Sequence, residues 1–351
     1  MQKVGLVGCG GVSNVHLDVY SLLGHRIEVA GVCDLDFELA KRTARKHGVN
    51  RVFADYNEML KALELDFIDV CTPTVTHPRI AIDAAKAGCN ILVEKPMART
   101  VKECEEMIAE AAQRGVSLCV CHNKRFSRCL QRTKQITEHP NWATSLSYVR
   151  SRYGNRPANH KPWMHNEANG GILWESGTHT VYVQTYLLGE IDEVLATSNQ
   201  ANAVTDRSFC IILHSKSGAL GIIDLIWGQT DAEEFYCRLD STRGEQVEAD
   251  LFTDFFMHTG ARSHVGFAVD WTRKILDDLK RFYGMRISYA AHYSSGPSRF
   301  FRRTHLELIH QFSQSLKEKT TPPVTTKEGL ETIRILEAIE KSLKERRAVK
   351  V

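Results

Sequence analysis

The stretch Val4-Gly5-Leu6-Val7-Gly8-Cys9-Gly10-Gly11-Val12-Ser13 decides how the N-terminal half of this chain folds. It starts as an apolar run typical of a buried strand, and a helical spacing of apolar residues follows it. Gly8 permits a tight turn, Gly10 lets the backbone approach a pyrophosphate, and the small Ser13 lets the helix pack on the strand. The sequence therefore predicts a dinucleotide-binding turn made by Gly8, Gly10, Gly11, Val12 and Ser13.

An acidic residue ends the next predicted strand. Asp34 lies 21 residues after Ser13, where a carboxylate can hold the hydroxyls of an adenosine ribose. A carboxylate there repels a 2′-phosphate, and Leu35 and Asp36 offer no positive charge to receive one. The predicted cofactor is therefore NAD rather than NADP. The alternative is that Asp34 caps the helix that begins near Asp36, and the two roles are compatible.

Strand and helix patterns alternate through residue 122. Strands are predicted at 4–8, 27–33, 67–71, 90–94 and 117–121, and helices near 13–23, 36–47, 56–64, 77–87 and 101–114. This alternation predicts right-handed βαβ units in a doubly wound parallel sheet. The expected fold class is α/β, with a Rossmann domain over residues 1–122.

The pattern changes from about residue 143. Strands are predicted at 145–152, 194–199, 208–214, 220–227 and 235–241. Short turns join several of them and cannot form parallel crossovers, so a largely antiparallel sheet is expected within a second domain over 123–351. Two helices are also predicted, one over 170–188 entered through Gly170-Gly171 and one opened by the capping-box pair Thr325 and Glu328.

The composition narrows the class of protein. The chain has 351 residues, too many for one typical core. Its 45 Lys and Arg against 42 Asp and Glu give a net charge of +3, which is too balanced to predict binding to nucleic acid or to an anionic membrane. No apolar run approaches the length of a membrane span, and the start lacks a signal-peptide pattern, so a cytoplasmic location is expected.

The ten cysteines lie mostly inside apolar strand patterns, which predicts buried, reduced thiols. The segment Cys119-Val120-Cys121-His122 resembles a metal motif. It lacks a matching second pair and alternates as a strand does, so no metal site is predicted.

Two polar segments follow neighbouring predicted strands. Thr72-Pro73 and His77 follow strand 67–71, and Glu94-Lys95-Pro96 follows strand 90–94. Ligands of an open α/β sheet bind beyond the carboxyl ends of its strands, so both segments are predicted to lie beside the cofactor. An ammonium at Lys95 can orient a substrate hydroxyl or stabilise charge that develops on its oxygen. The alternative is a solvated surface lysine.

A third motif lies in Gly170-Gly171-Ile172-Leu173-Trp174-Glu175-Ser176-Gly177-Thr178-His179. Glu175 and His179 are four residues apart, so on a helix they share a face. A carboxylate beside an imidazole holds its tautomer and raises its pKa, which suits a general base. The alternative is an ordinary surface pair.

Together these motifs resemble the glucose–fructose oxidoreductase, inositol dehydrogenase and rhizopine-catabolism (Gfo/Idh/MocA) family. The glycine turn and the two polar segments occur in the family's order and spacing. The same holds for Asn123-Lys124-Arg125-Phe126, for Gly170 to His179 and for the end of the chain at Pro322-Pro323-Val324-Thr325.

The resemblance implies what the spacing alone does not. Lys95 and His179 would be catalytic, with Glu175 assisting. Cofactor contacts would come from Thr72, Pro73, His77, Glu94, Lys95 and Asn123. The substrate would be a sugar, a polyol or a related cyclic alcohol. The second domain would carry an open, mostly antiparallel sheet, through whose face the chain would form a homodimer or homotetramer.

The chain departs from the family in three places. Glu175 and Tyr182 stand where the family usually has Asp, and most members lack a long segment like 255–298. A helix is predicted over 265–285 in this insertion. Packing on the core or on another subunit is the favoured interpretation, with a substrate lid or a membrane contact as alternatives.

The predicted function is hydride transfer between a carbinol of a sugar or cyclic polyol and NAD. His179 would take the hydroxyl proton, Lys95 would hold the oxygen and Glu175 would orient His179. Polar and aromatic groups suit sugar hydroxyls and faces, and the candidate substrate contacts are Arg125, Arg152, Tyr153, His160, Lys161, Trp163 and His165. One alternative is a redox-neutral glycosidase or lyase that retains NAD and acts by transient oxidation and elimination. Another is a non-catalytic NAD-responsive regulator.

Overall fold

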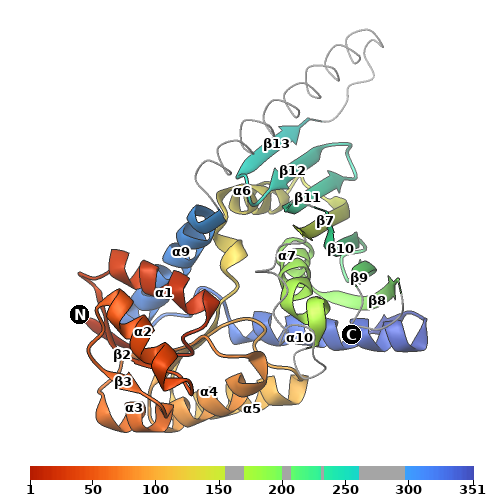
Figure 1. Ribbon diagram of the computed structural model, residues 1–351. Helices are drawn as coiled ribbons and strands as arrows, with labels where there is room; N and C mark the ends of the chain where they lie inside the picture. The colour runs from red at the N-terminus through yellow and green to blue at the C-terminus, as the bar shows by residue number, and fades with distance from the viewer. Residues whose placement is uncertain (155–169, 200–206, 231–232, 261–296) are drawn as a thin grey trace. The chain divides into compact units, whose positions relative to one another are not determined.

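The structure is a computed structural model that describes residues 1–154, 170–199, 207–230, 233–260 and 297–351 (Figure 1). Unit 1 comprises Met1–Asn123 and Phe301–Arg334, and unit 2 comprises Lys124–Phe300 and Ile335–Val351. The predicted helix over 265–285 lies outside the described residues. So do the candidate substrate contacts His160, Lys161, Trp163 and His165.

Unit 1 contains a parallel six-stranded sheet in the order β3-β2-β1-β4-β5-β6. Its strands are β1 (Gln2–Val7), β2 (Ile27–Cys33), β3 (Val52–Phe53), β4 (Phe67–Val70), β5 (Asn90–Val93) and β6 (Leu118–Val120). The helices between them are α1 (Gly11–Leu22), α2 (Phe37–His47), α3 (Tyr56–Ala62), α4 (His77–Lys86) and α5 (Val101–Arg114). This order confirms the predicted doubly wound Rossmann sheet. The two-residue β3 was too short for its pattern to be recognised.

One segment from the C-terminal part of the chain, Phe301–Arg334, completes unit 1. Helix α9 (Pro297–Glu318) packs through Phe312, whose ring meets that of Phe67 edge-on at 5.5 Å between centroids. Gln2 on β1 donates its side-chain amide to the Ser313 carbonyl at 3.2 Å. Residues 301–334 therefore pack with the Rossmann sheet, and the domain limits 1–122 and 123–351 remain a prediction.

Unit 2 contains an eight-stranded sheet in the order β13-β12-β11-β7-β10-β9-β8-β14. Its strands are β7 (Thr144–Gly154), β8 (Ile191–Ser198), β9 (Ser208–Ser215), β10 (Leu220–Thr230), β11 (Glu234–Ser241), β12 (Gln246–Asp250), β13 (Phe255–Thr259) and β14 (Val349–Lys350). Within the described residues β7 and β10 pair in parallel and the other pairs are antiparallel. The predicted mostly antiparallel second sheet is confirmed.

Three helices accompany this sheet, namely α6 (Arg128–Thr137), α7 (Thr178–Leu188) and the end of α10 (Thr326–Glu345). Helix α7 lies along the sheet, as Figure 1 shows, where Gln184 donates to the carbonyls of Ser147 and Ile222 at 3.2 and 2.9 Å. The capping box at the start of α10 forms as predicted, because Thr325 and Glu328 exchange hydrogen bonds between side chain and backbone.

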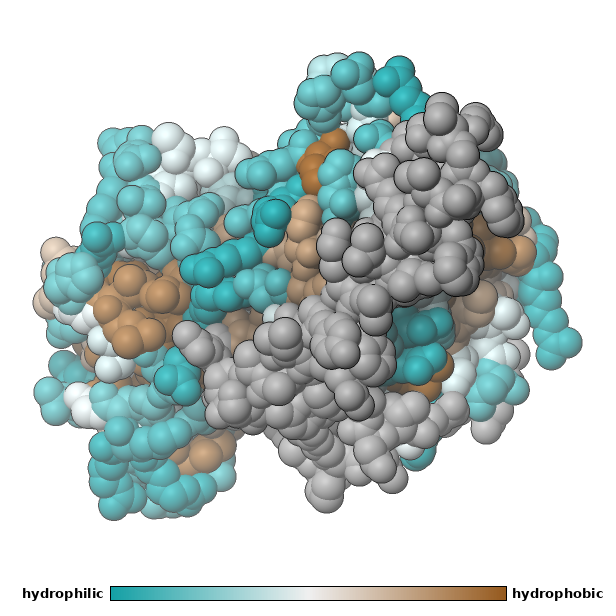
Figure 2. Space-filling model, turned by 90° about the horizontal axis from the view of Figure 1, so that it is seen from above, coloured by the Kyte–Doolittle hydropathy of each residue, from teal (hydrophilic) through white to brown (hydrophobic). Residues whose placement is uncertain are grey.

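The polarity of the surface and the burial of the cysteines agree with what the composition predicts. Hydrophilic side chains predominate on the described surface seen in Figure 2. Among the described helices, none has the length and apolar character needed to cross a bilayer. All ten cysteines are thiols, and all except Cys210 are buried, as predicted.

Candidate cofactor and catalytic site

The glycine turn connects β1 to α1. Gly8 has a φ of +95°, and a Cβ there would lie 2.7 Å from the carbonyl carbon of Cys71, so glycine is required. At Gly10 a Cβ would meet no described atom within 4 Å, which leaves room for a ligand. Helix α1 has neither an acidic first-turn residue nor a side-chain cap. Its first N–H groups and positive dipole end therefore suit a pyrophosphate.

Asp34 follows β2 and reaches the glycine turn. Its Oδ2 accepts the Cys9 N–H at 2.7 Å, and its Oδ1 accepts the Asp36 N–H at 2.8 Å. Helix α2 is capped by Asp36, whose side chain accepts from Leu39, so Asp34 is not the cap. Each carboxylate oxygen offers two acceptor positions, so Asp34 retains capacity for ribose hydroxyls. The residues of this turn fit a dinucleotide.

An Asp34→Ser variant should bind NAD about 10-fold to 100-fold more weakly, because it loses the charge-assisted hydrogen bonds to the ribose. It should also lose the preference for NAD over NADP, because the charge that repels a 2′-phosphate is gone. Titration of the full-length protein with each nucleotide measures both effects. The matched control is Asp36→Ser, since serine also caps α2 and should leave both affinities unchanged. An unaltered NAD preference in Asp34→Ser would contradict this role.

His77 ties the two polar loops of unit 1 together. Its Nδ1 lies 2.9 Å from the carbonyl oxygen of Pro96, and its Nε2 lies 2.8 Å from that of Thr72. Burial lowers the pKa of His77, although both carbonyls oppose the shift. Thr72 in turn borders the glycine turn, because a Cβ at Gly8 would lie 2.9 Å from its Cγ2. The structure thus gives His77 a positioning role between the predicted cofactor loops.

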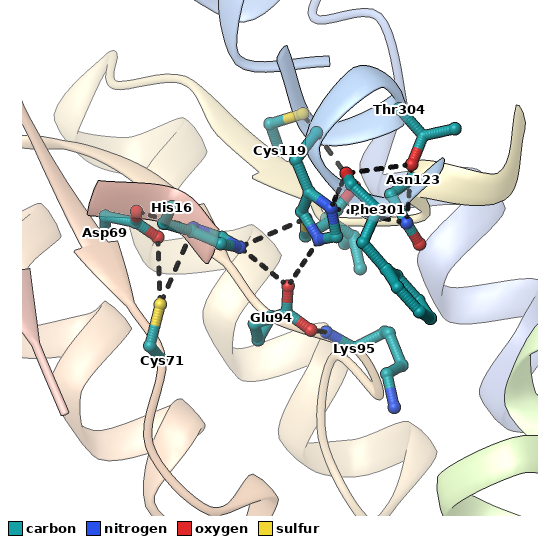
Figure 3. Close-up of polar contacts among 12 residues, drawn as sticks. His16, Asp69, Cys71, Glu94, Lys95, Cys119, Asn123, Phe301 and Thr304 are labelled. Carbon is teal, nitrogen blue, oxygen red and sulfur yellow. Dashed lines mark hydrogen bonds and ion pairs between the residues drawn. The ribbon is translucent and has the colours of Figure 1, made fainter. Parts of the chain in front are cut away.

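Glu94 and Lys95 follow β5 and have different surroundings. Glu94 is buried, and its Oε2 accepts the Lys95 N–H at 3.2 Å. The Lys95 side chain is half-buried, and in Figure 3 its ammonium points away from the polar cluster around Glu94. The buried carboxylate therefore anchors the Lys95 backbone. The Lys95–Pro96 peptide bond is cis.

A buried cluster of His16, Glu94, Cys121 and His305 adjoins Lys95, and the sequence pattern does not predict it. Glu94 Oε1 lies 3.1 Å from His16 Nε2 and 3.7 Å from His305 Nε2. Burial opposes ionisation of Glu94, but hydrogen bonds from both histidines hold its pKa well below the usual range. The signals in the sequence were the polar His16 on the buried side of α1 and Cys121 in the Cys-Val-Cys-His segment, but neither shows that the two side chains meet.

Asp69 on β4 supports the same cluster from its other side. Its Oδ2 lies 2.8 Å from His16 Nδ1 and accepts the Tyr20 hydroxyl at 2.8 Å. Burial disfavours a charged His16 ring, yet the Asp69 charge raises the pKa of His16 well above its ordinary value.

Asn123, a predicted cofactor contact, is also buried in unit 1 and donates to Thr304 Oγ1 of α9 at 3.0 Å.

The third motif lies in unit 2 and is helical over 171–188, as predicted, but part of it is a π-helical turn. Gly170 and Gly171 have φ values of 74° and 65°, which glycine adopts readily. Glu175 then lies in a π-helical turn, Leu173–Gly177, while His179 lies in the first turn of α7. A π-helical turn is wider than an α-helical one, so a spacing of four does not ensure a shared face here. Such turns frequently occur at functional sites.

Tyr153 and Arg152 lie on opposite faces of β7, because successive strand residues alternate. Tyr153 packs its ring 4.8 Å from that of Trp227, and burial followed by the Glu175 charge raises its pKa. Arg152 instead lies on the other face, with its Nε 3.7 Å from Glu234 Oε2. The structure therefore brings Tyr153, but not Arg152, to the side of the sheet that carries Glu175.

Arg125 is held by two tyrosines of α7. Its Nη1 donates to the Tyr182 hydroxyl at 3.3 Å, and its guanidinium lies 4.9 Å from the centre of the Tyr186 ring. The tyrosine that replaces the family's second Asp is thus a partner of this predicted substrate contact.

The chain is similar to known proteins over its whole length. Residues 2–122 match the Gfo/Idh/MocA model described as "Oxidoreductase family, NAD-binding Rossmann fold", and residues 145–351 match its C-terminal alpha/beta domain. Myo-inositol 2-dehydrogenase of Thermotoga maritima is 25% identical, covering 100% of this chain and 98% of that protein. A scyllo-inositol 2-dehydrogenase (NADP(+)) of Bacillus subtilis is 25% identical, covering 90% and 88%.

Among solved structures, the WlbA dehydrogenase from Bordetella pertussis in complex with NADH and UDP-GlcNAcA has a TM-score of 0.83 at 22% identity, covering 100% of this chain and 97% of the other. At this level of identity, the likeness shows that the two chains share a fold. The family model and the geometry of the glycine turn confirm NAD as the cofactor. This chain belongs to the Gfo/Idh/MocA family of NAD-binding oxidoreductases.

Proposed function

We propose that this protein is an NAD-dependent dehydrogenase that acts on a carbinol of a sugar or cyclic polyol. The observation that carries the proposal is Lys95, which follows β5 of the nucleotide-binding sheet with its backbone anchored to buried Glu94. Ligands bind beyond this end of a parallel sheet. The names of the inositol dehydrogenases similar to this chain support the substrate class.

NAD, when bound, supplies the hydride acceptor, and the protein must manage the proton and the charge on oxygen. The Lys95 ammonium holds the substrate oxygen and stabilises the negative charge that develops on it. His179 accepts the hydroxyl proton as a general base, and Glu175 orients His179. The proposal rests on the residue types and on the placement of each residue within its own unit.

Unit 2 offers groups suited to a sugar. Tyr153 and Trp227 form an aromatic pair near the Glu175 charge, and aromatic rings pack well on the apolar faces of sugars. Arg125, oriented by Tyr182, adds a donor for hydroxyl or carboxylate oxygens. These residues are the proposed substrate contacts among the described ones.

The proposal includes a cytoplasmic homodimer or homotetramer that forms through the open face of the unit 2 sheet. Support comes from Leu195 and Leu220 on this face, which are 41% and 39% exposed. Large apolar side chains in such positions are typical of an interface. The face also carries Arg150, whose Nε lies 2.9 Å from Asp224 Oδ2.

The test is a spectrophotometric assay of the full-length protein with NAD and a panel of inositols, aldoses and glucosides. NADH should accumulate with at least one inositol or sugar. Release of aglycone without net NADH would instead identify the redox-neutral alternative. Tight NAD binding without turnover of any compound would favour the NAD-responsive regulator and contradict the proposed activity.

A further inference from the structure

Four metal-ligating side chains meet in the buried core of unit 1. His16 comes from α1, Glu94 follows β5, Cys121 follows β6 and His305 comes from α9. One ligand atom from each lies within 4.8 Å of all the others. All four residues are buried, so bulk water does not solvate these groups.

The distances match the edges of a small coordination polyhedron. His16 Nε2 and Glu94 Oε1 are 3.1 Å apart, His305 Nε2 and Glu94 Oε1 are 3.7 Å apart, and Cys121 Sγ and His16 Nε2 are 4.0 Å apart. A tetrahedral zinc ion with normal bond lengths has edges of about 3.4 Å between nitrogen and oxygen and about 3.6 Å between nitrogen and sulfur. Shifts of a few tenths of an ångström, roughly, would bring these three pairs to such lengths, and the remaining pairs lie within 4.8 Å.

Neighbouring polar groups hold the outer atoms of both histidines and of the Glu94 carboxylate, so one atom of each points toward the middle of the cluster. His16 Nδ1 faces Asp69 Oδ2 at 2.8 Å, and His305 Nδ1 faces the Phe301 carbonyl oxygen at 2.7 Å. Each acceptor holds a proton on Nδ1 and leaves Nε2 as the ligand atom, which is the usual arrangement behind metal-bound histidine. Glu94 Oε2 is occupied by the Lys95 N–H, so Oε1 faces the two rings, as Figure 3 shows for His16.

This arrangement needs a positive charge at its centre. The Nε2 atoms of His16 and His305 point at the same carboxylate oxygen of Glu94, and without a metal ion the protons on these two atoms supply the charge that a bound cation would replace. Three electron-rich atoms in a dry interior repel one another unless protons or a cation lie between them. A divalent cation would also be neutralised by the Glu94 carboxylate and a Cys121 thiolate.

We propose that His16, Glu94, Cys121 and His305 bind a zinc ion as a closed structural site. Two imidazoles, a thiolate and a carboxylate are a ligand set that suits zinc, and four protein ligands leave no open position for a substrate. The ion would join α1 and α9 to the ends of β5 and β6. It would thereby fix the backbone that precedes Lys95 without taking part in the reaction.

The first experiment uses full-length protein purified without chelators. Elemental analysis should find one zinc per chain, or the protein should take up one Zn²⁺ on dialysis and gain roughly 5 °C or more in melting temperature. Replacement by Co²⁺ should produce the thiolate-to-cobalt charge-transfer absorption of a site with a cysteine ligand. Folded protein that neither contains nor takes up Zn²⁺ or Co²⁺ would overturn the proposal, and this measurement needs no variant.

The second experiment assigns the ligands. Cys121→Ser should lose the charge-transfer band and bind Co²⁺ at least about 10-fold more weakly. The matched control is Cys89→Ser, which removes another buried thiol of unit 1, one that contacts the Leu65 carbonyl, and should retain both. NAD binding and circular dichroism check that each variant is folded. An unchanged cobalt spectrum in folded Cys121→Ser would exclude this cluster as the site, whatever the outcome of the dehydrogenase assay.

Discussion

A Lys95→Met variant should lose about 10³-fold in kcat while its Kd for NAD changes by no more than a few-fold. Methionine retains a long apolar side chain of similar size but removes the ammonium. The lost interaction is stronger in the transition state, where negative charge develops on the substrate oxygen, than in the bound ground state. The defect should therefore appear mainly in kcat rather than in KM.

The Lys95 effect is measured as initial rates of NADH formation, with fluorescence titration giving the Kd for NAD. Lys86→Met serves as the control, because Lys86 is an exposed lysine at the end of α4 in the same unit. That variant should retain wild-type rates. Normal turnover in Lys95→Met would refute the proposed mechanism, whereas a loss of NAD binding would show that Lys95 acts on the cofactor instead.

A His179→Asn variant should lose about 10² to 10⁴ in kcat, because it cannot accept the hydroxyl proton. In the wild-type protein, the rate of alcohol oxidation should rise with pH as the base loses its own proton. In the variant, the rate should lack this rise with pH, apart from the slower increase that hydroxide in solution causes. A purely structural role for the nearly buried His179 would lower the rate without removing the rise.

The pH dependence of kcat is the decisive measurement for His179. His139→Asn is the control, since His139 is an exposed histidine just after α6 in the same unit and should leave kcat and its pH profile unchanged. If His179→Asn keeps the wild-type profile, another group is the base. Melting temperatures of both variants separate this outcome from a loss of folded protein.

The Rossmann half of the fold was predictable because its signals are local. Strands covered on both faces are short apolar runs, and β2 begins and ends where the pattern indicated. In unit 2 the prediction missed β12, which reads Gln-Val-Glu-Ala-Asp. There Glu248 is buried because the Tyr236 hydroxyl of the neighbouring strand donates to it at 2.7 Å. Hydropathy cannot reveal a polar residue that a cross-strand partner makes tolerable.

The segment of unit 2 that holds the proposed catalytic residues Glu175 and His179 was predictable in part. The glycine pair before Glu175 requires a special backbone conformation, and the structure has it. The predicted helix is present, but it contains a π-helical turn, which depends on packing rather than on residue spacing. Likewise, the opposite faces of Arg152 and Tyr153 depend on which side of β7 is covered by α7, and one strand alone does not show that.

The sequence by itself determined the nucleotide-binding half of the candidate site. The glycine turn, Asp34 and Lys95 each depend on a conformation or a strand end that a few neighbouring residues encode. Only the tertiary structure decided the buried cluster, because its four side chains come from α1, from the residues after β5 and β6, and from α9, and these lie together only after the chain has folded. A histidine on an apolar helix face has the same pattern whether it meets water, a carboxylate or a metal ion. Its chemistry depends on the partners that folding brings to it.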